Sequence, residues 1–256
     1  MGRDFTLDIY RKLCISLMKG GFQMSRVNDY LSSSIQEEGK KIIMRHDVDL
    51  RPERALAMAK LEKSLGFNST YYFRYIDGVF NEEIIKEISS IGHEIGYHYE
   101  VLAKCNGKMP EAIDKFKFEL SKFRQIVHID TICMHGSPLS KWNDLDLWDN
   151  YNFEDYEIQG EAFLSINYDK VHYFTDTGRS WNGAAYNVRD KVQSKKSKIL
   201  VKSTSELIYA LNSINSDVSI NTHPQRWHNG FFGWTFELLS QNIKNIGKRY
   251  LLRKHG

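Results

Sequence analysis

The sequence predicts an α/β protein built on a parallel β-sheet. Short β-branched and aromatic runs alternate with amphipathic stretches of helical length, and several of the apolar runs end in ionisable side chains. Strands that alternate with helices of about 10–15 residues are typical of βαβ units, which place the strands in parallel. With 256 residues, 41% of them hydrophobic, the chain can form one large core, so we expect a single domain.

The first expected elements follow from apolar spacing and from turn residues. Apolar side chains at helical spacing predict a helix over residues 7–20, which ends in a glycine pair. The apolar run Ile42-Ile43-Met44, which ends in a cluster of ionisable side chains, predicts a strand over residues 41–49. A helix is expected over residues 51–65, because Pro52 suits its first turn and Gly66 suits its C-terminal cap.

The later elements follow the same alternation. The β-branched and aromatic run 69–75 predicts a strand, and Asn81 suits the N-cap of a helix that extends to Ile91. The remaining expected elements are strands at 94–98, 131–134, 171–175 and 218–222, and helices at 110–125, 204–214 and 235–246. In parallel α/β folds, the reactive groups gather where the carboxyl ends of the strands meet.

Composition excludes several classes of protein. The net charge of +3 comes from interspersed charges without a basic arm, so nucleic-acid binding is not expected. Three cysteines, Cys14, Cys105 and Cys133, form no CxxC pair, which argues against a disulfide framework and a thiolate zinc site. The N-terminus has no apolar signal segment, and no apolar run reaches the ~20 residues that cross a bilayer. We therefore expect a cytoplasmic protein without a transmembrane segment.

Two carboxylates stand at the end of the first predicted strand, in the run Arg45-His46-Asp47-Val48-Asp49. Side chains alternate along a strand, so Asp47 and Asp49 are expected on the same face. A buried carboxylate is costly unless it is paired or bound to a metal. The pair therefore predicts a metal site or an acid–base site, and the alternative is that Asp49 only caps the following helix.

Histidines end three further predicted strands: His98, His135 and His223. A lone histidine is usually structural, but a carboxylate pair at the same edge of the sheet favours a functional site. The turn after His135 contains Gly136 and Ser137, whose backbone N–H groups are candidates for an oxyanion site; a simple tight turn is the alternative. A proline follows His223 and keeps it extended, and His223 is a candidate general acid.

A polar turn follows the predicted strand at 171–175. Its Asp176–Arg179 pair is either structural or orients a catalytic carboxylate. The tryptophans could stack against a sugar ring, but most of them are expected in the core.

The pattern as a whole resembles the polysaccharide deacetylases of the NodB-homology type, carbohydrate esterase family 4. The matching motifs are Asp47-Val48-Asp49, Ser69-Thr70-Tyr71-Tyr72-Phe73, Gly92-His93-Glu94-Ile95-Gly96-Tyr97-His98 and Thr222-His223-Pro224, in that order. More narrowly, Arg-His-Asp-Val-Asp, Met-His-Gly-Ser-Pro and His-Pro-Gln-Arg-Trp are similar to a subgroup associated with bacterial surface polysaccharides. The resemblance implies a single-domain, distorted (β/α) barrel of about seven strands that removes an N-acetyl group from a sugar.

The resemblance also implies a role for each matching residue. Asp47 would be the general base and His223 the general acid. Asp49 and His98 would hold a divalent metal ion, for which Zn²⁺ is the expected identity.

The chain departs from the family pattern at the remaining ligand. The family has a second metal-binding histidine four residues after the first, and here that position is Leu102. His135, which ends the neighbouring strand, is the first candidate to replace it, and Glu100 is the second. The family's arginine motif is also incomplete, and the candidates for the arginine that pairs with the base are Arg179, Arg45 and Arg226.

The expected function is metal-assisted hydrolysis of the acetamide of an amino sugar or of a surface-polysaccharide precursor. Hydrolysis of a cyclic amide or ureide on the same barrel is one alternative. A catalytically inactive, glycan-binding protein is another, because Leu102 removes a usual ligand.

The expected organisation is one catalytic domain over residues 1–256. Its core would be 41–227, preceded by a helical extension over 1–40 and followed by a helix over 235–253. The segment 243–253 mixes apolar and basic residues, so it is either a peripheral membrane attachment or an ordinary packed helix with a solvated basic end.

Overall fold

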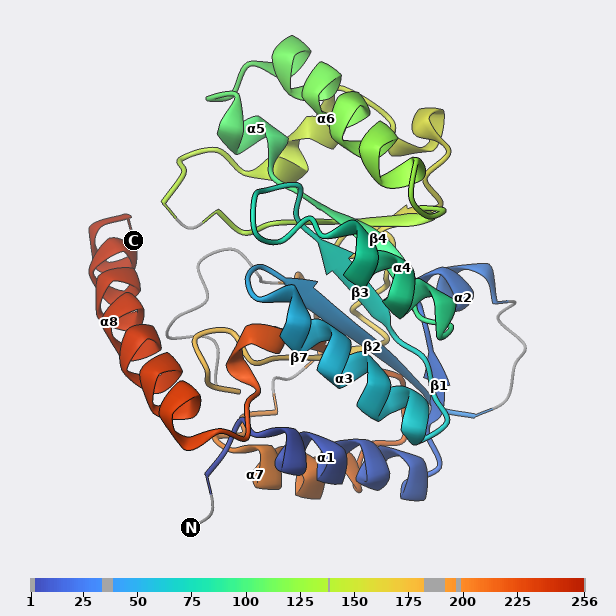
Figure 1. Ribbon diagram of the computed structural model, residues 1–256, viewed down its shortest axis with the longest axis vertical. Helices are drawn as coiled ribbons and strands as arrows, with labels where there is room; N and C mark the ends of the chain where they lie inside the picture. The colour runs from blue at the N-terminus through green and yellow to red at the C-terminus, as the bar shows by residue number, and fades with distance from the viewer. Residues whose placement is uncertain (1–2, 34–38, 138, 182–191, 197–198, 256) are drawn as a thin grey trace.

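The fold is a parallel β-sheet covered by helices. The computed structural model describes residues 3–33, 39–137, 139–181, 192–196 and 199–255 (Figure 1). In chain order the helices and strands are α1 (Leu7–Lys19), β1 (Gln23–Ser25), α2 (Val27–Ser32), β2 (Lys41–Val48), α3 (Pro52–Ser64), β3 (Thr70–Phe73), α4 (Glu82–Ser90), β4 (Glu94–Tyr99), α5 (Val101–Lys104), α6 (Met109–Arg124), β5 (Thr131–Met134), the 3₁₀ helices η1 (Asp144–Asp149) and η2 (Phe153–Tyr156), β6 (Gly160–Glu161), β7 (His172–Thr175), α7 (Thr204–Leu211), β8 (Val218–Thr222), the 3₁₀ helix η4 (Pro224–Arg226) and α8 (Phe231–His255).

The strands form one sheet in the order β6-β5-β4-β3-β2-β8-β7, and every pair is parallel. β1 lies off this path and pairs with the first residues of β2, on the edge that β3 uses further along. The sheet curls into an open, distorted (β/α) barrel whose edge strands, among the described residues, are β6 and β7. This confirms the predicted fold class.

Two segments differ from the sequence expectation. Residues 1–40 were expected to form a helical extension, but β1 lies within them and joins the sheet. Three residues are too few to show a strand period, so the sequence carries no signal for this strand. The last helix, expected over 235–253, begins earlier, at Phe231, and runs to His255.

The alternation of side chains along β2 sorts them between two environments. Ile42 and Met44 point outward and pack in a core with side chains of α1 and α7, two helices that lie side by side below the sheet (Figure 1). Ile43 belongs to the other core, and Arg45 and Asp47 follow it on the inner face. The strand thus places two charged side chains inside the barrel.

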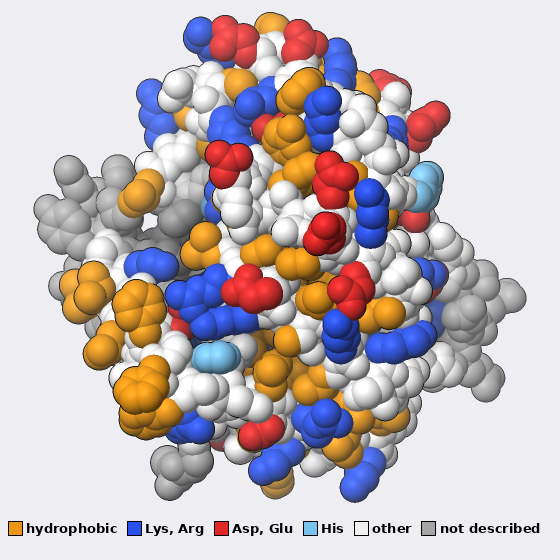
Figure 2. Space-filling view, viewed as in Figure 1, with side chains coloured by type: hydrophobic (Ala, Val, Ile, Leu, Met, Phe, Trp, Pro, Cys, Tyr) orange, Lys and Arg blue, Asp and Glu red, His pale blue; other side chains and the backbone are white. Residues whose placement is uncertain are grey.

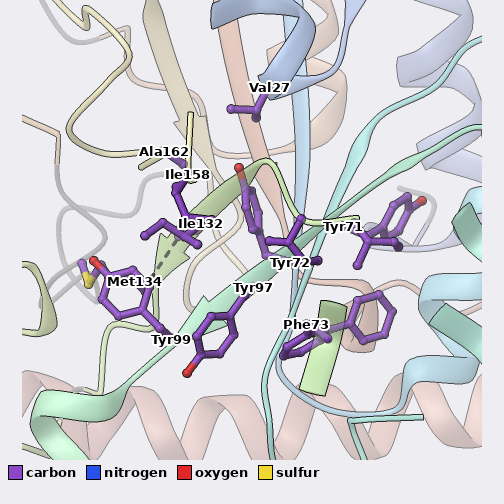
Figure 3. Packing of buried hydrophobic residues seen from close by; sticks show 14 of the residues in the cluster. Val27, Tyr71, Tyr72, Phe73, Tyr97, Tyr99, Ile132, Met134, Ile158 and Ala162 are labelled. Carbon is purple, nitrogen blue, oxygen red and sulfur yellow. Dashed lines mark hydrogen bonds between the residues drawn. The ribbon is translucent and has the colours of Figure 1, made fainter. Parts of the chain in front are cut away.

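Aromatic side chains fill much of the larger core. Figure 3 shows Tyr71, Tyr72 and Phe73 of β3 together with Tyr97 and Tyr99 of β4, and all five are fully buried. Tyr72 lies on the inner face, where its hydroxyl is 2.8 Å from Thr131 Oγ1. Tyr97 lies on the outer face and donates to Glu119 of α6. The aromatic strands therefore anchor the covering helices as well as the barrel interior.

A buried carboxylate, Glu62 of α3, ties the outer face of the sheet together. Glu62 Oε1 lies 2.9 Å from His46 Nε2 and also accepts from the Tyr10 hydroxyl. Its other oxygen accepts from Ser69 Oγ (2.5 Å) and from the Tyr71 hydroxyl (2.8 Å). Burial raises the pKa of Glu62, but His46, His93 and these donors outweigh burial and lower the pKa to about 2.

The longest helix, α8, follows the last strand and runs along one side of the molecule (Figure 1). It is held to the body by Asn245, whose Nδ2 donates to the carbonyl of Gly178 at 2.8 Å. Among the described residues, no helix combines the length and the apolar character needed to cross a bilayer.

Replacing Glu62 with Gln is expected to lower the free energy of unfolding at pH 7 by about 3 kcal/mol. A depressed folded-state pKa means that the carboxylate stabilises the fold above its ordinary pKa of 4.5, and that this stability is lost as the pH falls towards about 2. Urea denaturation at pH 7 and at pH 3 would measure this. The stability difference between wild type and variant should shrink at pH 3. Glu83→Gln, on the exposed face of α4, is the control and should change stability by less than about 1 kcal/mol.

Candidate metal and acid–base site

Polar side chains from four strands meet at the carboxyl end of the barrel. In the parallel register, His98 of β4 lies opposite Cys133 of β5, so His135 follows two residues further along the same edge. Asp47 ends the inner face of β2, and Asp49 follows the last residue of that strand. His223 directly follows β8. The register of the sheet thus collects these groups at one end.

Asp49, His98 and His135 point their ligand atoms at one another. Asp49 Oδ1 lies 3.5 Å from His98 Nε2 and 3.6 Å from His135 Nε2. All three atoms lie within 4.8 Å of one another. The two imidazole rings are perpendicular, with centroids 5.2 Å apart. One oxygen and two nitrogens therefore face a common point.

Hydrogen bonds behind each imidazole determine which nitrogen faces that point. His98 Nδ1 lies 2.9 Å from the Cys133 carbonyl, which can only accept, so Nδ1 carries the proton. His135 Nδ1 lies 2.9 Å from a carboxylate oxygen of Glu100, and the same reasoning applies. Both Nε2 lone pairs are then free to ligate. An imidazole held by its other nitrogen in this way is typical of metal centres.

Glu100, the second candidate for the missing ligand, lies behind His135 and orients it. The Glu100 carboxylate accepts from Arg74 Nη2 with both oxygens at 2.7 Å and lies 3.2 Å from Lys104 Nζ. Burial raises the pKa of Glu100, but His135 and Arg74 outweigh burial and hold the pKa well below its usual range. The geometry therefore favours His135 over Glu100 as the third ligand.

The residues of this cluster fit a divalent ion. Asp49 Oδ1 is buried and has no hydrogen-bond partner among the described residues, although two imidazoles face it. Burial raises the pKa of Asp49, but His98, His135 and His223 lower it well below its ordinary value. One carboxylate and two imidazoles are a donor set that suits Zn²⁺.

A second group of possible ligands, Asp47, His98 and Cys133, is less suited to a metal ion. Two of these residues already accept a hydrogen bond from Arg45 Nη1: Cys133 Sγ at 2.6 Å and Asp47 Oδ1 at 3.3 Å. The Arg45 guanidinium thus already neutralises the Asp47 carboxylate. The cluster around Asp49 is therefore the better candidate.

Asp47 is held rigidly beside the cluster. Its Oδ1 pairs with Arg45, and its Oδ2 accepts from Asn221 Nδ2 at 2.7 Å. Burial raises the pKa of Asp47, but Arg45, His98 and His223 outweigh burial and lower it. Asp47 is therefore an ionised carboxylate at neutral pH, in a fixed orientation.

Arg45, one of the three arginines considered, is the partner of Asp47. Arg179 is not: its Nη1 donates to the Trp234 carbonyl at 2.9 Å, and its guanidinium lies 4.6 Å from the centroid of the Trp234 ring. Arg179 sits in a turn after β7 that faces α8, so an orienting role towards Asp47 does not fit its position. The expectation for Arg179 is corrected accordingly.

His223 is oriented by Asp176, from the polar turn after β7. Asp176 Oδ1 lies 2.6 Å from His223 Nδ1, and Oδ2 accepts from the His223 backbone N–H at 3.1 Å. Arg226 Nη1 (2.5 Å) and Trp227 Nε1 (2.8 Å) hold the same carboxylate. Burial raises the pKa of Asp176, but Arg226 and His223 lower it. His223 Nε2 then faces the cluster, 3.8 Å from Asp49 Oδ2.

The turn after β5 lies beside His135. Ser137 has a positive φ of 33°, and its Oγ lies 3.1 Å from His135 Nδ1. Gly136 connects the two residues, while Pro138, the last residue of that motif, lies outside the described residues. Leu102, by contrast, is buried in the core, and its backbone N–H donates to Asp144 Oδ1 at 2.8 Å.

The sequence suggests the five residues that meet here, but not the residues that support them. The partners it did not assign are Asp176 to His223, Asn221 to Asp47, Gln225 to Asp49 (3.2 Å) and Arg74 to Glu100. Asn221 had a usable signal, because it precedes His223 by two residues and therefore shares its face. The turn at Asp176 is polar in the sequence, but its partner depends on how β7 pairs with β8.

The fold and the site together define an α/β barrel with a candidate metal and acid–base centre. No family model and no curated protein matches this chain. Among solved structures, it is similar to the Xyl-CE4 domain of a multidomain xylanase from the hindgut metagenome of Trinervitermes trinervoides, with 14% identity and a TM-score of 0.44 over 83% of this chain and 85% of that one. It is also similar to a Streptococcus mutans CE4 esterase, with 13% identity and a TM-score of 0.45 over 90% and 89% of the two chains.

A third similar structure is a CE4 family pseudoenzyme from Bacillus anthracis. It shows 12% identity and a TM-score of 0.44, over 82% of this chain and 62% of that one. All three carry the name of the family that the motifs resemble. Likenesses at these identities and TM-scores carry no information on activity.

Replacing His135 with Ala is expected to weaken Zn²⁺ binding at least about 100-fold, because one of three protein donors is lost. Glu100→Gln should weaken it by about 10–100-fold, because it removes the carboxylate that orients His135. Isothermal titration with Zn²⁺ would measure both. His128→Ala is the matched control, since this histidine is exposed at the surface. Unchanged affinity in His135→Ala would show that His135 is not a ligand.

Proposed function

We propose that this chain is a metal-dependent hydrolase that removes the N-acetyl group from an amino sugar, as a divergent member of carbohydrate esterase family 4. One observation carries the proposal. A two-histidine, one-carboxylate cluster lies close to an ionised carboxylate, Asp47, and to a histidine held by its own carboxylate, His223. Hydrolysis of an unactivated amide needs these elements together: an electrophilic centre, a base and an acid.

Asp49, His98 and His135 would hold the metal ion. When bound there, a divalent ion such as Zn²⁺ supplies a Lewis acid that polarises the acetyl carbonyl and lowers the pKa of water. The three residues contribute one negative charge, so the ion would keep part of its positive charge for this purpose.

Asp47 would take the proton from the attacking water. Its pairing with Arg45 and Asn221 keeps it ionised and fixes its orientation, so no side-chain entropy is lost as the reaction proceeds. The same pairing makes Asp47 a weaker base than a carboxylate in free solution. The water must therefore be acidified before Asp47 can accept its proton efficiently.

His223 would donate a proton to the departing amine. An amide nitrogen that leaves unprotonated is a very poor leaving group, so this step needs an acid on the far side of the reacting carbon. Asp176 accepts at Nδ1 and thereby leaves Nε2 as the nitrogen that faces substrate, as in an Asp–His pair of a hydrolase. The backbone N–H groups of Gly136 and Ser137 are proposed as further donors to the developing oxyanion.

The variants Asp47→Asn and His223→Ala are expected to lower the rate of deacetylation at least ~100-fold without loss of the fold. The measurement is acetate release from N-acetylglucosamine oligosaccharides by Zn²⁺-loaded protein. His128→Ala, an exposed histidine, serves as the control with unchanged rate. Near-wild-type rates in both site variants would contradict the base and acid roles of Asp47 and His223. Zn²⁺ binding without acetate release from any N-acetylated sugar would favour the cyclic-amide or glycan-binding alternatives.

Asp176→Asn is expected to lower kcat about 10–100-fold and to leave KM nearly unchanged, because Asp176 acts on His223 and does not touch substrate. Steady-state kinetics would separate the two constants. Asp169→Asn, a carboxylate of an exposed turn, is the control. A variant with raised KM and normal kcat would instead indicate a role in binding.

A further inference from the structure

Helix α8 turns its polar face towards the protein and its apolar face outward, whereas a helix that packs on a core does the opposite. Its buried positions are polar: Glu237, Gln241 and Asn245 are each less than 8% exposed and follow one another at helical spacing. Gln241 Nε2 donates to Asn245 Oδ1 at 2.8 Å, and Asn245 in turn donates to the body of the protein. Polar contacts, rather than an apolar interface, therefore hold this stretch of α8 in place.

The opposite face of the same helix is apolar and exposed. Phe232, Phe236, Leu239, Ile243 and Ile246 recur at alternating intervals of four and three residues, and between 59% and 88% of each side chain is exposed. Such spacing places them in a single stripe along the helix. Figure 2 shows hydrophobic side chains gathered along the edge of the molecule that α8 occupies. A contiguous exposed apolar stripe of this kind marks an interaction surface.

Positive charge borders the stripe. The Arg3 guanidinium lies 5.7 Å from the centroid of the exposed Phe231 ring, and the Arg51 guanidinium lies 6.0 Å from that of Phe236. Lys244, which directly follows Ile243 in the helix, is also exposed. From residue 241 to the end, the sequence contains Lys244, Lys248, Arg249, Arg253 and Lys254 and no acidic residue. From residue 241 onwards, the charged residues of the helix are therefore all basic.

We propose that the exposed face of α8 docks on an anionic lipid bilayer. Apolar side chains flanked by cations, on a helix that lies flat on its protein, match the acyl-chain boundary and the phosphate groups of a membrane surface. A second copy of this chain fits the surface less well. Two parallel helices would bring their basic ends together, and an antiparallel pair would meet no acidic side chain on the exposed face.

The position of α8 links this surface to the candidate site. Phe236 lies against Arg51, which is two residues beyond Asp49. Asn245 binds Gly178, in the turn that contains Asp176. The docking face thus borders the end of the barrel where the candidate site lies. On the proposed function, which this consequence assumes, docking would bring the site to an N-acetylated sugar carried on a lipid.

Co-sedimentation of the full-length chain with vesicles tests the docking without reference to catalysis. We expect binding to vesicles that contain phosphatidylglycerol, weaker binding to pure phosphatidylcholine, and loss of binding as salt is raised. The double variant Phe232→Ser, Ile243→Ser should bind the anionic vesicles at least about tenfold more weakly. Both side chains are largely exposed, so the variant should melt at the temperature of the wild type.

The matched control is the double variant Leu200→Ser, Tyr209→Ser, which removes equally exposed apolar side chains near and on α7 and should bind vesicles as the wild type does. Equal binding by the α8 double variant and the wild type would overturn the proposal, as would a wild type that does not sediment with anionic vesicles. A concentration-dependent dimer in light scattering that is lost in the α8 double variant would assign the surface to a second copy instead. A protein that binds vesicles but releases no acetate would leave the docking intact and contradict the proposed function alone.

Discussion

The ion pair between Arg45 and Asp47, inside the barrel, is the interaction on which the site depends. Both side chains are removed from water, and either charge alone would be strongly unfavourable there. Arg45 is accommodated because its guanidinium also donates to Cys133 and Tyr173 and lies 4.6 Å from the centroid of the Phe163 ring. With that cation below it, Asp47 stays ionised although a second carboxylate, Asp49, follows two residues later. The barrel interior thus supports two neighbouring negative charges.

Parallel register determines which side chains meet His98 at the carboxyl end of the sheet. His98 and Cys133 are partners across β4 and β5, so the residue two positions after Cys133 reaches the space in front of His98. His135 occupies that position. The helix that begins at Val101 contributes Leu102 to the core, and Glu100, directly before that helix, orients His135. The candidate cluster therefore combines side chains from the ends of two neighbouring strands with Asp49 of a third.

The sequence predicts the features that depend on the side-chain pattern of a single strand. Period-two alternation and the ends of apolar runs were enough to predict the sheet and to select Asp47, Asp49, His98, His135 and His223 as candidates. It does not predict the contacts that depend on how two segments distant in the sequence pack together. The pairing of Asp176 with His223 depends on β7 lying beside β8, and the choice of Arg45 over Arg179 depends on which arginine points into the barrel. The sequence does not predict β1, because three residues are too few to show a period of two. Its position in the sheet is determined by its pairing with β2.

The buried carboxylate of Glu62 has a consequence for the accuracy of strand pairing. His46 alternates with Arg45 and Asp47 along β2, and Glu62 and Thr222 hold it on the outer face. A slip of β2 by one residue would turn Asp47 towards α3, carboxylate against carboxylate, and would turn His46 into the barrel. Repulsion between Asp47 and Glu62 would therefore destabilise a sheet with the wrong register. In this way Glu62, on the outer face of β2, helps to keep Arg45 and Asp47 on the inner face.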